Sequence, residues 1–227
     1  MKKLTDHQNS IINSIDDNEE NKISLEKGFG KKGNIKVGPV EINNELRDVC
    51  YQNAYEHGFH DKEYSDEHWL MLIITEIGEA VNAHRRGKRA RKDMFLELQK
   101  YDSNFQKQNK DWAEKFFCRV FEDYIKDTVE DELADVVIRC LDYMGYKRFD
   151  LPNPISMFSD TSFTENMYFA IQQLSLSSYR TIDKHSLMLV IGTMMNEANK
   201  LGSDLLWFIE QKIRYNKTRE RLHGKLY

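Results

Sequence analysis

Two pairs of acidic residues have a spacing that places each pair on one face of a helix. Glu76 and Glu79 are three residues apart, and so are Glu132 and Asp135. Residues three apart in an α-helix are neighbours on its surface, so each segment presents two carboxylates side by side. Two such helices packed together bring four carboxylates into one place. Because the set contains no histidine, it favours a hard divalent cation, Mg²⁺ or alternatively Mn²⁺, over zinc or copper.

The first pair lies on or beside an apolar helix face. On a helical wheel, Glu76 falls between two apolar groups, Leu72 and Ala83 on one side and Trp69 and Ala80 on the other. Glu79 lies one turn further on at the edge of the same face. Burying an unpaired carboxylate is expensive, so Glu76 needs a partner. Either a metal ion or a salt bridge to an arginine or lysine of another helix meets this need, and the metal ion is the favoured interpretation.

The second pair lies on the polar side of its segment, opposite an apolar stripe, so an ordinary solvated face is the alternative. The acids of this region are Asp127, Glu130, Asp131, Glu132, Asp135 and Asp142. They are poorly balanced by nearby bases, and such a cluster repels itself unless a cation lies within it. We therefore expect a metal ion here as well.

The segments Thr75–Val81 (TEIGEAV) and Asp131–Val137 (DELADVV) resemble the paired acidic motifs of the MazG-like, all-α nucleoside-triphosphate pyrophosphatases. This superfamily also includes dimeric dUTPases and dCTP pyrophosphatases. The resemblance covers about residues 65–145 and the C-terminal helix and tail, although the gap between the motifs is longer than usual and predicts an inserted helix or lid. It implies a MazG-like helical bundle with a four-helix metal-binding core and Mg²⁺-dependent hydrolysis between the α- and β-phosphates. The implied metal ligands are Glu76, Glu79, Glu132 and Asp135.

The C-terminal region supplies a candidate phosphate-binding site. Lys212, Asn216 and Arg219 recur on one helix face and are followed by His223-Gly224-Lys225. The pattern is similar to a stretch that contacts the triphosphate in some family members, and lysine, amide and arginine groups bind phosphate oxygens well. A basic last turn that complements the helix dipole is the alternative. The basic residues from Arg85 to Arg91 are the second candidate for phosphate binding.

The aromatic residues His68 and Trp69 precede the first motif by about two turns. They are candidates for a base-binding pocket, in which their rings would stack on the base, with an ordinary core position as the alternative. The pairs His57–His60 and Glu220–His223 have weaker patterns and are interpreted as surface features that hold no metal.

Helical periodicity and the scarcity of proline predict an all-α fold without a sheet. Residues 1–36 are predicted to be a flexible arm or linker, residues 37–227 the catalytic domain, and residues 149–162 a proline-containing linker. A second apolar stripe, Leu187–Ala198, resembles Trp69–Ala83 but carries one acid, Glu197. The breadth of both stripes favours a homo-oligomer, a dimer or tetramer, as the resemblance also does. The predicted helices span residues 41–57, 65–86, 91–101, 110–146, 163–179, 184–201 and 203–218.

Charge and cysteine content exclude several partners. The 33 basic and 37 acidic residues give a net charge of −4, so nucleic acid is not expected as a partner. Three widely spaced cysteines indicate neither a disulfide framework nor a zinc knuckle and fit the cytoplasm. The apolar runs are too short to span a membrane.

The sequence therefore predicts a cytoplasmic, Mg²⁺-dependent hydrolase that converts a nucleoside triphosphate into its monophosphate and pyrophosphate. No catalytic residue is assigned beyond the metal ligands. One alternative is a base-selective dUTPase or dCTPase of the same superfamily. The other is a helical binding or regulatory protein without enzymatic activity.

Overall fold

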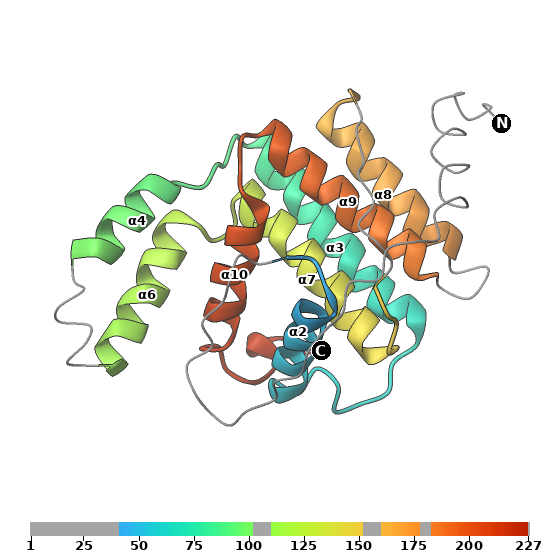
Figure 1. The fold of residues 1–227 in the computed structure, drawn as a ribbon, viewed down its shortest axis with the longest axis horizontal. Coiled ribbons are helices and arrows are strands. Elements are labelled where there is room, and N and C mark those ends of the chain that lie inside the picture. The colour runs from blue at the N-terminus through green and yellow to red at the C-terminus, as the bar shows by residue number, and fades with distance from the viewer. Residues whose placement is uncertain (1–40, 102–109, 152–159, 178–182, 227) are drawn as a thin grey trace, which may run out of the picture. The chain divides into compact units, whose positions relative to one another are not determined.

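The structure, a computed structural model, describes residues 41–101, 110–151, 160–177 and 183–226. All regular structure in these ranges is helical, which confirms the all-α prediction (Figure 1). None of the described helices has the length and apolar character needed to cross a membrane. The predicted arm at 1–36 and most of the predicted linker at 149–162 lie outside the described residues.

Most predicted helices agree with the structure to within a few residues. A short C-terminal 3₁₀ turn, η1, was not predicted from the sequence. The elements are α2 (Asn44–Glu56), α3 (Asp66–Arg85), α4 (Lys92–Tyr101), α6 (Lys110–Tyr124), α7 (Val129–Tyr146), α8 (Phe163–Ser177), α9 (Lys184–Lys200), α10 (Leu205–Asn216) and η1 (Arg221–Gly224).

The prediction of one continuous helix over 110–146 is wrong, because a turn separates α6 from α7. Asp127 adopts a left-handed conformation with φ of 57°, which a short polar side chain tolerates better than most. Thr128 is the extended N-cap of α7 and accepts a hydrogen bond from the Asp131 amide at 3.4 Å. The turn at 125–128 contains neither glycine nor proline, so helical periodicity continues through it unbroken.

Helix α7 is the central element of the bundle. It packs against α2, α3, α9 and α10, so residues on several of its faces are buried, including Leu133, Val137 and Met144. At its crossing with α2, a Cβ atom on Gly145 would lie 2.5 Å from the Cβ of Tyr51. Only glycine therefore allows the two backbones to approach this closely.

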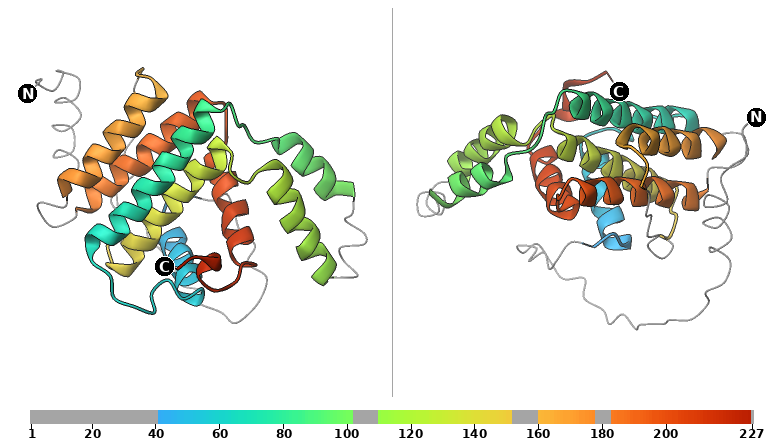
Figure 2. Two further views of the ribbon diagram at one scale, coloured as in Figure 1. Left: turned by 180° about the vertical axis from the view of Figure 1, so that it is seen from behind. Right: turned by 90° about the horizontal axis from the view of Figure 1, so that it is seen from above.

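Helices α3 and α7 run antiparallel (Figure 2). Just beyond the end of α3, the Lys88 carbonyl accepts a hydrogen bond from the amide of Val129, the first residue of α7, at 3.0 Å. At the other end, Lys147 contacts Asp66 at 3.1 Å. Gly87, with φ of 64°, turns the chain after α3. This pairing sets the acids of α3 beside the first turn of α7.

The apolar stripes of α3 and α9 are covered within one chain. Helix α3 packs against α7 and α8, and α9 packs against the same two helices. The stripe residues Ile73, Ile77, Leu187 and Met194 are all buried. The stripes thus do not require a second copy of the chain, and the predicted homo-oligomer has only the resemblance as support.

The region between the two motifs contains two helices. Helices α4 and α6 contact each other and lie side by side in Figures 1 and 2. The ring of Phe95 meets that of Phe117 edge-on, with centroids 5.9 Å apart. Helix α6 also contacts α10. The predicted insertion is therefore a helical hairpin with its own small apolar contact.

Candidate metal centre

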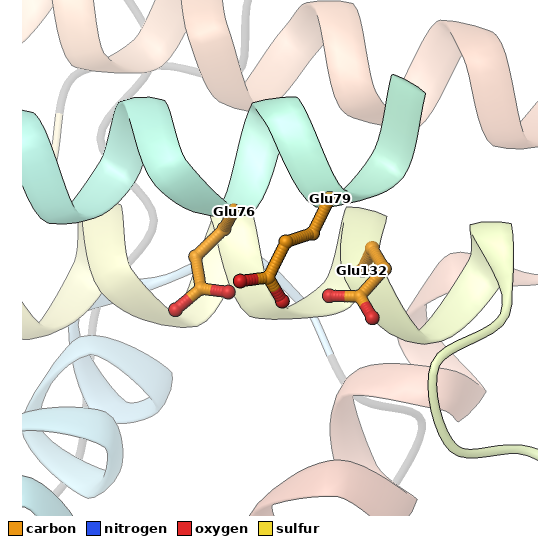
Figure 3. Close-up of side chains that lie close together, drawn as sticks. All are labelled: Glu76, Glu79 and Glu132. Atoms are coloured by element: carbon orange, nitrogen blue, oxygen red, sulfur yellow. The ribbon is translucent and has the colours of Figure 1, made fainter. Parts of the chain in front are cut away.

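Three of the four predicted ligands converge. Glu76 and Glu79 on α3 and Glu132 on α7 project into the same space (Figure 3). One carboxylate oxygen from each lies within 4.8 Å of those of the other two. Oxygens on opposite sides of one Mg²⁺ ion lie about 4.2 Å apart. Small side-chain movements would therefore let the three carboxylates share one ion.

Two of these acids are buried. Glu76 is 5% exposed and Glu132 is 4% exposed, whereas Glu79 is exposed. A solvated face, the alternative for Glu132, is therefore wrong. Because α2, α3, α9 and α10 surround α7, its acidic side is covered as well as its apolar side.

Burial makes the negative charge of this group costly. Burial, followed by the nearby carboxylates of Asp135 and Asp131, raises the pKa of Glu132 to about 9. Burial and Asp135 also raise the pKa of Glu76, although Arg139 opposes them. Among the described residues, Glu132 and Glu79 form no ion pair with a base, unlike their neighbours. A bound cation would supply the missing positive charge.

Asp135, the fourth predicted ligand, faces Lys212 at the edge of the cluster. The Lys212 ammonium lies 2.7 Å from Asp135 Oδ2 and 2.8 Å from Asp131 Oδ2. Its side chain is buried, so the predicted phosphate-binding lysine is held by two carboxylates. The expectation that this acidic region lacks bases is therefore wrong at Asp131 and Asp135.

Glu76 has the salt bridge that was considered for it as an alternative. Arg139 of α7 donates from Nε to Glu76 Oε1 at 3.2 Å, and its guanidinium lies 5.1 Å from the ring centre of Phe59. A carboxylate has two oxygens with several lone pairs. Glu76 Oε2 therefore remains available to a cation while Oε1 holds Arg139.

The other acids of the region have structural partners. Arg89 Nε contacts Glu130 Oε1 at 2.7 Å, and His60 Nε2 contacts Asp142 Oδ1 at 2.7 Å. The prediction that His60 is a surface residue is wrong, because its side chain is 3% exposed and stacks on Trp69 with ring centres 4.8 Å apart. The partner of Asp142 lies in the segment after α2, which the acid spacing alone does not reveal.

The predicted base-stacking residues lie away from the carboxylates. Trp69 is buried in the core, and His68 stacks on Tyr64 with ring centres 4.1 Å apart. Neither lines the cavities that border the acidic cluster. The geometry thus gives the stacking role of His68 and Trp69 no support.

A first cavity, of about 40 Å³, borders Glu76 and is bounded by α2, α7, α10 and η1. Asn216 and Arg219, both predicted as substrate-binding, line it, and so does Asn53, which sequence reasoning missed. His223 lines it as well, so the interpretation of this residue as a surface feature is wrong. Asn53 Oδ1, Asn216 Oδ1 and His223 Nε2 are buried and lack a hydrogen-bond partner among the described residues. Unpartnered buried polar atoms are rare and indicate a place for a polar ligand or water.

His223 contributes a donor to this cavity. Burial, followed by the positive charge of Arg219, lowers the pKa of His223 to about 3, so the ring is neutral at neutral pH. Arg219 Nη1 donates to His223 Nδ1 at 3.2 Å, which leaves the proton on Nε2. The cavity therefore presents one ring N–H and two amide oxygens to a ligand.

A second cavity, of about 230 Å³, borders Glu79 and Glu132 on the other side of the cluster. Its remaining lining comes from the end of α3, the loop after it and the turn before α7. These residues are Asn82, Ala83, Arg86, Lys88 and Asp127. The carboxylate cluster thus lies between a narrow cavity with unused hydrogen-bonding atoms and a wider one with two basic side chains.

Comparison of the chain with models of protein families, with curated proteins and with solved structures finds no match. The function is therefore inferred from the site itself. An all-oxygen group of carboxylates, two of them with no base partner within the described ranges, suits a hard divalent cation.

Proposed function

We propose that this chain is a Mg²⁺-dependent nucleoside-triphosphate pyrophosphohydrolase of the MazG-like type. The observation that carries the proposal is the convergence of Glu76, Glu79 and Glu132 from two antiparallel helices. Glu132 is buried and pairs with no base in the part of the chain that the structure describes, although burial of an unpaired carboxylate is costly. These acids belong to the two sequence motifs on which the resemblance rests.

The donor set fits Mg²⁺, with Mn²⁺ as the alternative. Glu79, Glu132 and Oε2 of Glu76 would hold the ion, and Asp135 would join them if its carboxylate turned from Lys212. When bound, Mg²⁺ neutralises phosphate charge and lowers the pKa of a coordinated water. Arg139 keeps Glu76 in place through its hydrogen bond to Oε1.

The reaction adds one water across the anhydride between the α- and β-phosphates. The P–O bond to the bridging oxygen breaks, and the products are a nucleoside monophosphate and pyrophosphate. In our proposal the nucleoside side of the substrate lies toward Asn53, Asn216 and His223, whose unused polar atoms would bind the base or sugar. The cavity of about 40 Å³ holds about one water, so the η1 turn must move to admit a nucleoside.

A pyrophosphate-release assay over all common ribo- and deoxyribonucleoside triphosphates, with and without Mg²⁺, tests the proposal. Release that requires Mg²⁺ and disappears in Glu132→Gln supports it. No release from any nucleotide would contradict it and favour the helical binding protein. Activity confined to dUTP or dCTP would identify the base-selective alternative.

We also propose a homo-oligomer, a dimer or tetramer, which rests on the resemblance alone. Light scattering over a range of protein concentrations checks this. A mass that stays at 26.9 kDa, the mass of one chain, would contradict it.

A further inference from the structure

Most bases near the carboxylates are already engaged. Lys212 is held between Asp131 and Asp135, and Arg89 is held by Glu130. Arg219 donates to the His223 carbonyl at 3.0 Å. A substrate with several phosphate charges needs cationic groups that face the metal centre and are not consumed by strong internal pairs.

Arg86 and Lys88 meet this requirement in the second cavity. Both line the cavity that Glu79 and Glu132 border. Arg86 is exposed, and Lys88 reaches Asp127 only at 3.7 Å, with 42% of its side chain exposed. An exposed ion pair of this kind contributes little. Both side chains can therefore turn toward an anion in the cavity at small cost.

The backbone that carries these two bases is fixed relative to the acids. The amides of Arg86 and Lys88 both donate to the Ala83 carbonyl, at 3.2 and 3.0 Å. The Lys88 carbonyl in turn accepts from the Val129 amide at 3.0 Å. The loop is thus tied to the end of α3 and the start of α7, so the two bases stay opposite Glu79 and Glu132.

We propose that this cavity binds the diphosphate part of the substrate and the pyrophosphate product, with Arg86 and Lys88 contacting phosphate oxygens. The inference rests on the proposed function for its place in the reaction, but diphosphate binding does not depend on turnover. It fixes the direction of the substrate along α3, with the nucleoside beside Glu76 and the diphosphate beside Glu79 and Glu132. The anhydride bond then lies over the carboxylates, between the two cavities.

The relative sizes of the cavities support this direction. The cavity beside Glu79 and Glu132 has about 230 Å³ and two bases, and the one beside Glu76 has about 40 Å³ and unpartnered amide oxygens. Amide oxygens repel phosphate oxygens, because both are hydrogen-bond acceptors. A diphosphate therefore fits the second cavity in size, and Arg86 and Lys88 offer cationic contacts to its oxygens there.

Calorimetric titration of the whole chain with inorganic pyrophosphate in excess Mg²⁺ tests the inference. Arg86→Gln and Lys88→Gln should each raise the dissociation constant about tenfold or more, because each removes a charge-assisted contact. Arg85→Gln is the matched control, since it removes the same charge one residue away and Arg85 does not line the cavity. Its dissociation constant should stay within about twofold of the wild-type value.

Product inhibition distinguishes a local phosphate contact from a general effect of lost positive charge. If the chain hydrolyses nucleotides, inhibition by the monophosphate product should change less than twofold in Arg86→Gln and Lys88→Gln, while inhibition by pyrophosphate weakens about tenfold. Equal weakening by Arg85→Gln, or unchanged binding in both cavity variants, would overturn the inference. The chain could also bind pyrophosphate through Arg86 and Lys88 and yet hydrolyse no nucleotide. This result would support the diphosphate site and contradict the proposed function.

Discussion

Two helix pairs of this molecule each bury a glutamate, but they treat its charge differently. In the α8–α9 pair, Glu197 Oε1 accepts a hydrogen bond from Asn166 Nδ2 at 2.7 Å and forms an ion pair with Lys200 Nζ at 2.9 Å. In the α3–α7 pair, Glu132 lies close to Glu76 and Glu79 and, among the described residues, is not paired with a base. Glu197 therefore has a structural environment of its own, whereas Glu132 lies in a group that repels itself.

This difference shows that burial of an acid does not by itself indicate a functional site. A buried acid with complete partners stabilises a fold, and removal of a partner is costly. A buried acid whose nearest polar groups are other acids is stable only as a neutral acid or with a cation. The first arrangement connects two helices, and the second prepares a site for a ligand.

The largest expected effect is the loss of activity when the α3–α7 acids are neutralised. Glu76→Gln, Glu79→Gln, Glu132→Gln and Asp135→Asn should each lower kcat by roughly a thousandfold, about 4 kcal/mol, because each removes an anionic ligand and keeps the side-chain volume. Steady-state pyrophosphate release measures this, and circular dichroism confirms the helices. Near-wild-type turnover in two of the four variants would show that the metal centre is misplaced.

The matched control comes from the other helix pair. Glu197→Gln makes the same chemical change in a buried glutamate, so its kcat/KM should stay within about twofold of wild type. A loss comparable to that of Glu132→Gln would mean that any buried charge change disables the chain, and the comparison would then lose its functional meaning.

Lys212→Met tests whether the lysine is a structural partner or a phosphate grip. The substitution leaves Asp131 buried and unpaired, so the free energy of unfolding should fall by about 3–5 kcal/mol. Urea denaturation measures the change. If Lys212 served only to bind phosphate, the free energy of unfolding of the variant would match that of wild type, and only nucleotide binding would weaken.

Mg²⁺ should stabilise the α3–α7 site specifically. At a concentration 100 times its dissociation constant, a ligand that binds only the folded state adds about 2.7 kcal/mol. Wild type and Glu197→Gln should show this gain in thermal unfolding, and Glu132→Gln should not. An equal gain in Glu132→Gln would place the cation elsewhere.

Sequence periodicity predicted most helices, and the spacing of three predicted that Glu76 and Glu79 share a helix face, because both depend on local geometry. The meeting of Glu132 with these two acids depends on the packing of α3 on α7 and was expected from the resemblance. The partners of Asp131 and Asp142 could not be predicted this way. Lys212 is 81 residues from Asp131, and His60 is 82 residues from Asp142. Such pairs depend on how α10 and the segment after α2 pack on α7, which no local pattern specifies. The break before α7 was missed because its turn lacks glycine and proline.

The smallest effect is also the one that reverses sign between the two helix pairs. In Mg²⁺-free buffer, Glu132→Gln should raise the free energy of unfolding. Because burial and the neighbouring Asp135 and Asp131 raise the pKa of Glu132 to about 9, the acid must take up a proton when the chain folds at neutral pH, and a neutral amide does not carry this cost. Glu197→Gln should lower the free energy of unfolding by about 1 kcal/mol, because the amide oxygen still accepts from Asn166 but the ion pair with the partly exposed Lys200 is lost. Urea denaturation of both variants at neutral pH measures the two changes. If both variants were destabilised equally, Glu132 would have a structural partner as Glu197 does. The contrast between a ligand site at Glu132 and a structural contact at Glu197 would then not hold.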